Sequence, residues 1–289
     1  MNSYYTLVAS KQDPASNLMA EYLINQVGFS ISKKNYAANR SSLNREEDDF
    51  SEYHYGNIIT LHVSHNSSLL YLDKLDDKYP DSEAFIFLSR HSSESGIPTL
   101  TCHFTGNFSA SNPYGGNPRE LGICFPSLQK EYIKEINTAR SQVPNYQITI
   151  EATHHGPTSL KKPTLFIEIG STPRQWVDKH AASIVCDSLV SLVSRKKNTD
   201  NHCKSVGIAL GGTHYPAKFN QLLLESDFGL AAVAAKHSLT AIDESMMQQM
   251  ISKSIEKVTH AIVDRKGLGK EKHRILELIA EKDLELLEV

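Results

Sequence analysis

Two adjacent histidines, His154 and His155, stand in a turn that follows a predicted strand and precedes Gly156-Pro157. A neutral imidazole is the commonest metal ligand among side chains and also a general base near neutral pH. Neighbouring side chains of an extended chain point to opposite faces, so both rings can serve one site only if the chain turns, which Gly156-Pro157 permits. The alternative is one histidine packed beneath the loop and the other solvated. The zincin signature His-Glu-x-x-His is absent from the sequence.

Four other turns that carry histidine, glycine or hydroxyl residues also follow predicted strands. They lie at residues 89–92, 103–107, 170–173 and 211–215. Ligands bind at the carboxyl edge of a parallel sheet, so we expect these turns to line one cleft. The glycine turns at 170–173 and 211–215 open helices, whose N–H groups can bind an anion in addition to ordinary capping. Neither turn matches the P-loop or the dinucleotide G-x-G-x-x-G pattern, which argues against an NTPase or a nicotinamide dehydrogenase.

Glu168 lies within the apolar strand predicted at 164–169. A carboxylate in a covered strand is costly unless it is paired or binds a metal. Near the end of the strand Glu168 could face the cleft as a base or a ligand, and a salt bridge to a Lys or Arg is the alternative. Glu151, on the strand that leads to His154, raises the same question.

Strands and helices that would position these turns alternate along the chain. Hydrophobic periodicity predicts strands at 4–9, 58–63, 84–88, 100–104, 146–153, 164–169, 205–210 and 260–263, and helices at 14–28, 127–140, 173–195, 216–225, 244–255 and 270–281. This order predicts an α/β fold with a mixed, largely parallel central sheet flanked by helices. We expect a single domain over residues 1–289, with a polar surface insertion around 32–53 and a long Gly-, Asn- and Pro-rich loop at 105–126.

The composition limits the partners of the chain. The 289 residues carry a formal net charge of −3, so a protein that coats nucleic acid broadly is excluded, whereas a local contact is not. Lys161 and Lys162, beside the histidine turn, could contact phosphate or simply be solvated. The four scattered cysteines are typical of reduced thiols. No apolar run reaches the roughly 20 residues of a membrane span, and no signal peptide is evident, so we expect a cytoplasmic protein without a membrane partner.

Four segments spread over residues 84–219 resemble the archaeal- and plant-type D-aminoacyl-tRNA deacylase family: SRHSSESG, TCHFTGNF, EATHHGPTSLKKPTLFIEIGSTPRQW and GIALGGTHYPAKF. The resemblance implies a hydrolase that cleaves the ester between a D-amino acid and the 3′ end of tRNA, releasing both. It implies a zinc-dependent enzyme with D-aminoacyl-tRNA as its substrate. We expect a monomer with no obligate protein partner. It also implies a fold like that of nucleoside phosphorylases and bacterial peptidyl-tRNA hydrolase.

On this resemblance we expect particular residues to form the site. The expected catalytic residues are His91, His154, His155 and Glu168. The expected zinc ligands are His103, His154, His155 and His214. The expected substrate contacts are Thr105, Gly106, Asn107, Lys161, Lys162, Gly170, Ser171, Thr172, Gly211 and Gly212. The attacking water could be bound to zinc, which lowers its pKa to about 7, or deprotonated by a histidine general base. The alternative functions are another α/β hydrolase or phosphorylase, such as a peptidyl-tRNA hydrolase, and a non-catalytic tRNA-binding module.

Overall fold

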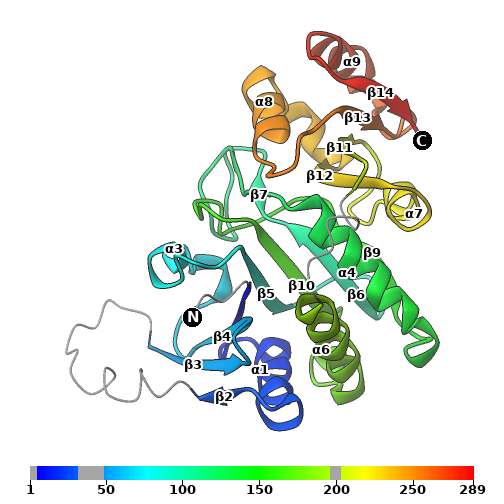
Figure 1. Cartoon of the computed structure of the whole chain (residues 1–289). Coiled ribbons are helices and arrows are strands. Elements are labelled where there is room, and N and C mark those ends of the chain that lie inside the picture. The colour runs from blue at the N-terminus through cyan, green and yellow to red at the C-terminus, as the bar shows by residue number, and fades with distance from the viewer. Residues whose placement is uncertain (1–4, 32–48, 196–202) are drawn as a thin grey trace. The chain divides into compact units, whose positions relative to one another are not determined.

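The computed structural model describes residues 5–31, 49–195 and 203–289 (Figure 1). The chain divides into two compact units, each assembled from three separate stretches. Unit 1 comprises Met1–Thr101, Glu135–Ile148 and Phe166–Lys196, and unit 2 comprises Cys102–Lys134, Thr149–Leu165 and Lys197–Val289. The single domain expected from the sequence stays a prediction. Of the expected insertion, residues 32–48 lie outside the described part of the chain.

The largest sheet has eight strands in the order β2-β3-β4-β1-β5-β10-β6-β9. The strands are β1 (Tyr5–Ser10), β2 (Ser30–Ile31), β3 (Phe50–Tyr55), β4 (Ile59–Ser64), β5 (Ala84–Arg90), β6 (Thr99–Phe104), β9 (Gln147–Ile150) and β10 (Thr164–Gly170). β1 pairs in parallel with β4 and β5, whereas β3 pairs antiparallel with both β2 and β4. The rings of Phe87 and Phe166 stack at 4.7 Å in the core of unit 1. The prediction of a mixed, largely parallel sheet flanked by helices is confirmed.

Helices of unit 1 pack beside this sheet, and α1 lies next to α6 (Figure 1). The helical segments are α1 (Pro14–Tyr22), the π-helix η1 (Leu23–Val27), η2 (Leu69–Tyr71), α3 (Leu75–Lys78), η3 (Arg140–Gln142), α5 (Pro173–Trp176) and α6 (Lys179–Ser194). Asp13 caps α1 by accepting a hydrogen bond from the Ser16 N–H at 2.9 Å. The helix predicted at 173–195 is two helices, because Asp178 forms a new N-cap that accepts from the His180 and Ala181 N–H groups.

Unit 2 contains a parallel four-stranded sheet in the order β12-β11-β13-β14. Its strands are β11 (Ser205–Leu210), β12 (Phe228–Ala234), β13 (His260–Val263) and β14 (Glu285–Glu288). The helical segments are α4 (Pro126–Thr138), which continues into unit 1 from Glu135 on, α7 (Ala217–Glu225), η5 (Lys236–Ala241), α8 (Glu244–Ser252), η6 (Gly269–Glu271) and α9 (Lys272–Ala280). The long loop at 105–126 contains the short antiparallel pair β7 (Gly106–Asn107) and β8 (Glu120–Leu121).

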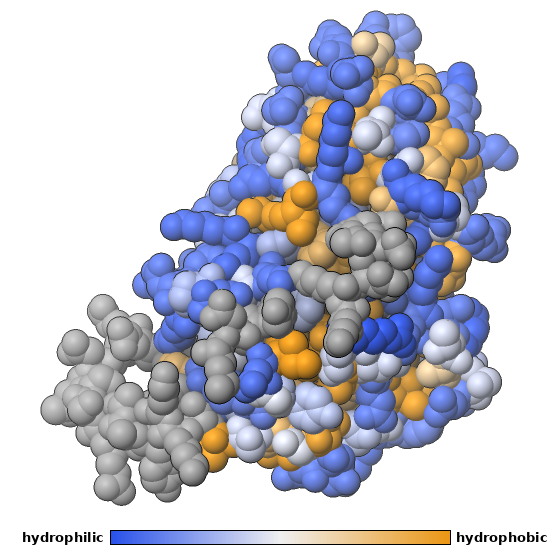
Figure 2. Space-filling model, viewed as in Figure 1, coloured by the Kyte–Doolittle hydropathy of each residue, from blue (hydrophilic) through white to orange (hydrophobic). Residues whose placement is uncertain are grey.

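Apolar side chains fill the cores, and hydrophilic residues are interspersed with apolar ones on the face drawn in Figure 2. Within the described residues, no helix combines the length and the hydropathy that a membrane crossing requires.

Candidate active site

Unit 2 gathers four histidines from three separate stretches of the chain. His103 is the last residue but one of β6, His154 and His155 form the turn after β9, and His214 lies between β11 and α7. The ring centroid of His154 lies 4.1 Å from that of His103, 4.4 Å from that of His155 and 4.8 Å from that of His214. The four residues expected to be zinc ligands are therefore neighbours, and we refer to them as the histidine cluster.

Backbone hydrogen bonds hold the three stretches together. The Gly106 N–H donates to the carbonyl oxygens of His154 at 3.2 Å and of His155 at 2.8 Å. The Ala152 N–H donates to the His214 carbonyl at 2.9 Å. The cluster is thus fixed by the main chain, and the Gly106 N–H serves to hold the histidine turn.

The loop at 105–126 packs closely on the same turn. The Gly156 N–H donates to the Tyr114 carbonyl at 3.0 Å, and a Cβ on Gly156 would lie 2.2 Å from the backbone nitrogen of Gly116. The Asn107 side-chain amide donates to the Gly115 carbonyl at 2.8 Å, which closes this loop. His155 has a φ of 44°, a left-handed conformation that is unfavourable for a residue with a Cβ.

The hydrogen-bond partner of Nδ1 shows which nitrogen carries the proton in three of these rings. The Nδ1 atoms of His103, His154 and His155 lie 3.1, 2.8 and 2.7 Å from the backbone carbonyl oxygens of Phe104, Ala152 and Gly156. A carbonyl can only accept a hydrogen bond, so each Nδ1 carries the proton and each Nε2 presents a lone pair. Ring nitrogens of these three histidines lie within 4.8 Å of one another. Metal-binding histidines usually donate their other N–H to a carbonyl or carboxylate, so the arrangement fits a metal ion.

Glu151 adds a buried carboxylate to the cluster. Its Oε2 lies 2.7 Å from His214 Nε2 and 3.8 Å from His154 Nε2. Glu151, His154 and His214 form a second group whose ligand atoms lie within 4.8 Å of one another. Burial, followed by the charges of the neighbouring imidazoles, holds the pKa of His154 well below its usual value. His154 is therefore neutral near pH 7, in the form that can bind a metal or accept a proton.

Unit 1 holds the other two residues expected to be catalytic. His91 Nδ1 lies 3.2 Å from Glu168 Oε2, and both side chains are buried. His91 is thus a partner of Glu168. The His91 N–H donates to the Ile169 carbonyl at 3.0 Å, and the His91 carbonyl accepts from the Trp176 indole at 2.7 Å. Burial, with a smaller contribution from the Glu168 charge, raises the pKa of the nearby Asp13. The catalytic roles of His91 and Glu168 stay predictions.

The turn at 170–173 belongs to unit 1 and its polar groups have partners there. The Ser171 hydroxyl donates to the Ile97 carbonyl at 2.6 Å. The Thr172 N–H donates to Gln175 Oε1 at 3.1 Å, which caps the four-residue helix α5. A Cβ on Gly170 would lie 2.7 Å from the Cβ of His91, so glycine is required for this approach.

The remaining expected substrate contacts belong to unit 2. Gly211 and Gly212 have φ values of 101° and 78°, and the Gly211 N–H donates to the Ala234 carbonyl at 2.9 Å. Thr105 forms a β-bridge with His154. Lys161 and Lys162 lie in the segment between the histidine turn and β10. Substrate binding by these residues stays a prediction.

The chain is thus an α/β protein with a cluster of histidines held by the main chain. A family model described as D-aminoacyl-tRNA deacylase matches residues 78–287. The D-aminoacyl-tRNA deacylase of Cenarchaeum symbiosum is 35% identical over 281 residues, which cover 97% of this chain and 98% of that protein. The D-aminoacyl-tRNA deacylase of Staphylothermus marinus is 34% identical over 277 residues, which cover 94% of each chain. A solved structure of a conserved protein of unknown function aligns with a TM-score of 0.85 and 26% identity, covering 99% of this chain and 95% of the other. The chain belongs to the D-aminoacyl-tRNA deacylase family, as its motifs predict.

Proposed function

We propose that this protein hydrolyses the ester bond between a D-amino acid and the 3′ end of tRNA, releasing the free amino acid and the tRNA. The observation that carries the proposal is the membership of the family together with a cluster of histidines whose Nδ1 atoms donate to backbone carbonyls. An aminoacyl ester is an activated substrate, so a positioned water and a group that takes its proton supply the main chemical requirements. The enzyme acts in the cytoplasm, where charged tRNA is used, and we expect a monomer without an obligate protein partner.

We further propose that His103, His154 and His155 hold a catalytic zinc ion through their Nε2 atoms. Three protein ligands with one open position are typical of catalytic zinc sites, and the fixed Nδ1–H bonds support this set. A zinc ion held there would supply Lewis acidity, which polarises the ester carbonyl and makes a neighbouring water easier to deprotonate.

His214 and Glu151 form the pair that would move the proton. The Glu151 carboxylate accepts a hydrogen bond from His214 Nε2, which leaves Nδ1 of His214 as the acceptor nitrogen. His214 then takes the proton of the attacking water, and the buried carboxylate stabilises the imidazolium that forms. The same ring can return the proton to the leaving ribose oxygen. This is the logic by which a carboxylate orients and supports a histidine base.

The proposal is tested with purified protein and tRNA carrying D-Tyr, L-Tyr or an N-blocked peptide. We expect release of D-Tyr at least tenfold faster than release of L-Tyr, and no cleavage of the blocked peptide. Equal rates for the two tyrosyl esters, or no release, would contradict a D-aminoacyl-tRNA deacylase. Cleavage of the peptidyl ester alone would indicate a peptidyl-tRNA hydrolase, and binding without turnover would indicate a tRNA-binding module.

The zinc proposal has a separate test. We expect a chelator to abolish the release of D-Tyr and zinc to restore it, and we expect His103→Ala to bind zinc at least about tenfold more weakly. Full activity of metal-free protein would instead assign the three imidazoles to acid, base or positioning roles.

A further inference from the structure

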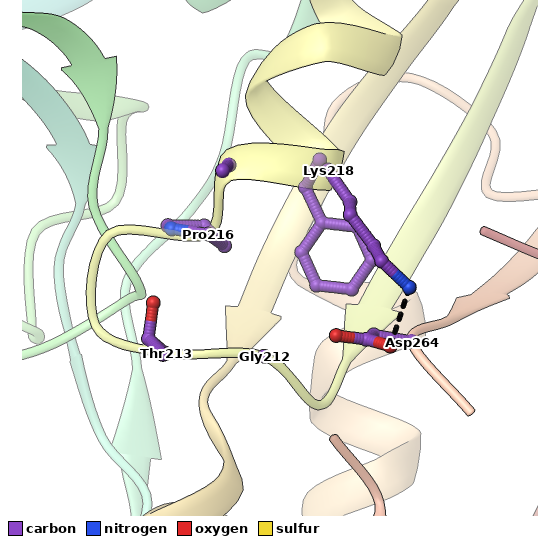
Figure 3. A pocket seen from close by; sticks show the side chains of 7 residues that line it. Gly212, Thr213, Pro216, Lys218 and Asp264 are labelled. Atoms are coloured by element: carbon purple, nitrogen blue, oxygen red, sulfur yellow. Dashed lines mark hydrogen bonds and ion pairs between the residues drawn. The ribbon is translucent and has the colours of Figure 1, made fainter. Parts of the chain in front are cut away.

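A cavity of about 160 Å³ opens in unit 2 on the loop that carries His214 (Figure 3). Its lining includes Gly212, Thr213, Pro216, Lys218, Phe219 and Asp264. Gly212, Thr213 and Pro216 lie in the loop after β11, and Asp264 follows β13; these strands are the two central ones of the parallel four-stranded sheet. The cavity therefore lies at the carboxyl edge of that sheet.

The strand order makes this edge a natural binding position. From β11 the chain runs through α7 to β12 on one side, and from β13 it runs through α9 to β14 on the other side. Right-handed crossovers that progress in opposite directions direct their helices to opposite faces of a sheet. The loops after β11 and β13 then diverge and leave a crevice between them, which is where open α/β sheets bind ligands.

The chemistry of the lining fits a ribonucleotide. Asp264 Oδ1 accepts a hydrogen bond from Lys218 Nζ at 2.9 Å (Figure 3). This ammonium also donates to the Val289 carbonyl at 2.8 Å. Burial opposes ionisation of Asp264, but hydrogen bonds from Lys218 and from the Gly267 and Lys266 N–H groups outweigh it and lower the pKa of the carboxyl. An ionised carboxylate accepts hydrogen bonds from ribose hydroxyls, and the third N–H of the ammonium can meet a phosphate oxygen.

The remaining wall is apolar and suits a base or a sugar. Pro216 and the buried Phe219 also line the cavity. A free phosphate is disfavoured, because it would meet the negative charge of Asp264 at close range. A nucleotide, in contrast, presents hydroxyls to the carboxylate and an apolar ring to the other side.

The loop also connects the cavity with the histidine cluster. Gly212 and Thr213 line the cavity, and the next residue, His214, contacts His154 and Glu151. Two residues of chain span at most about 7 Å, so the cavity wall and the His214 backbone are within one nucleotide length of each other. We propose that this cavity binds the 3′-terminal ribonucleotide of the tRNA and so delivers its ester to the histidine cluster. The inference rests on the proposed deacylase function.

The test measures binding of adenosine 5′-monophosphate, and of its 2′-deoxy analogue, to the full-length protein by calorimetry. We expect the wild-type protein to bind the ribonucleotide at least fivefold more tightly than the deoxy form. Asp264→Asn should bind the ribonucleotide and its deoxy form with equal affinity. Lys218→Met should weaken the binding of both by about fivefold and keep the ratio of their affinities. The control Lys257→Met changes an exposed lysine of the same unit and should bind as the wild type does. Thermal unfolding of each variant verifies that it is folded.

The same variants are then assayed with D-Tyr-tRNA. We expect a raised KM with kcat within about threefold of the wild-type value in Asp264→Asn and Lys218→Met. No binding of the ribonucleotide at millimolar concentration, or an unchanged ratio in Asp264→Asn, overturns the inference. Deacylation by a protein that does not bind the nucleotide would refute the cavity assignment alone. Nucleotide binding without deacylation would refute the proposed function and leave the cavity as a nucleotide site.

Discussion

Glu151→Gln tests whether the buried carboxylate supports His214 as a proton acceptor. The side chain of Glu151 is fully buried and its Oε2 lies 2.7 Å from His214 Nε2, so glutamine can keep the hydrogen bond while losing the charge. A charged hydrogen bond contributes about 1.5–3 kcal/mol and a neutral one about 0.5–1.5 kcal/mol. The midpoints of these ranges differ by about 1.3 kcal/mol, which corresponds to roughly a tenfold loss of kcat. Glu151→Ala also removes the acceptor of the His214 N–H, so its kcat should fall about a hundredfold.

The assay follows release of D-Tyr from saturating D-Tyr-tRNA, with the melting temperature measured for each variant. Glu285→Gln is the matched control, because Glu285 also pairs with a histidine, His260, at 3.4 Å but is 84% exposed. Its kcat should equal that of the wild type, since an exposed pair contributes little. A kcat within twofold of the wild-type value in Glu151→Gln and Glu151→Ala would refute the role given to the carboxylate.

Three further predictions concern stability. Urea unfolding of His155→Gly should give a free energy of unfolding about 1 kcal/mol higher than that of His155→Ala, because the φ of 44° at this position strains a residue with a Cβ. Both variants should lose deacylation. Equal free energies of unfolding would contradict strain at His155. Lys130→Met should lower the free energy of unfolding by about 2–4 kcal/mol, because the Lys130 ammonium donates to three backbone carbonyls. The control Lys134→Met changes an exposed lysine and should alter the free energy of unfolding by less than about 0.5 kcal/mol. Equal losses in the two variants would contradict this account. Burial opposes ionisation of Asp178, but hydrogen bonds from two backbone N–H groups and the Tyr146 hydroxyl lower its pKa. Ionised Asp178 therefore stabilises the folded state at pH values above its unfolded-state pKa, and this stabilisation is lost as the pH falls through the folded-state pKa. Acid unfolding of Asp178→Asn should accordingly depend less steeply on pH than that of the wild type, and identical profiles would contradict the assignment.

The elements that the sequence predicts well are those with a strong apolar pattern. The run Ala84–Leu88 is apolar on both faces and lies in the buried strand β5. β12 (Phe228–Ala234) was not predicted, because its glycine and three alanines have little strand propensity and its conformation is set by burial beside β11. β3 (Phe50–Tyr55) overlaps the end of the stretch expected to be an insertion around 32–53. It was not predicted, because its half-buried residues alternate too weakly to indicate a strand.

The candidate site, like the fold, could be predicted from the sequence only in part. The types and turn positions of His154 and His155 indicate chemistry without a structure, whereas the pairing of Glu151 with His214 joins residues 63 positions apart. No local pattern reports such a contact, because it depends on how the main chains of two loops meet. Gly106 was expected to contact substrate, and its N–H holds the histidine turn, a partner that sequence spacing cannot reveal.

The most direct test of the central claim is the kcat for D-Tyr-tRNA in His103→Ala, His154→Ala and His155→Ala, each verified to be folded. The account predicts a loss of at least about a hundredfold in every variant, because each ring supplies an Nε2 to the same centre. His273→Ala removes a histidine that is 87% exposed and should keep the wild-type rate. Wild-type rates in the three cluster variants would contradict the claim that this cluster is the deacylation site.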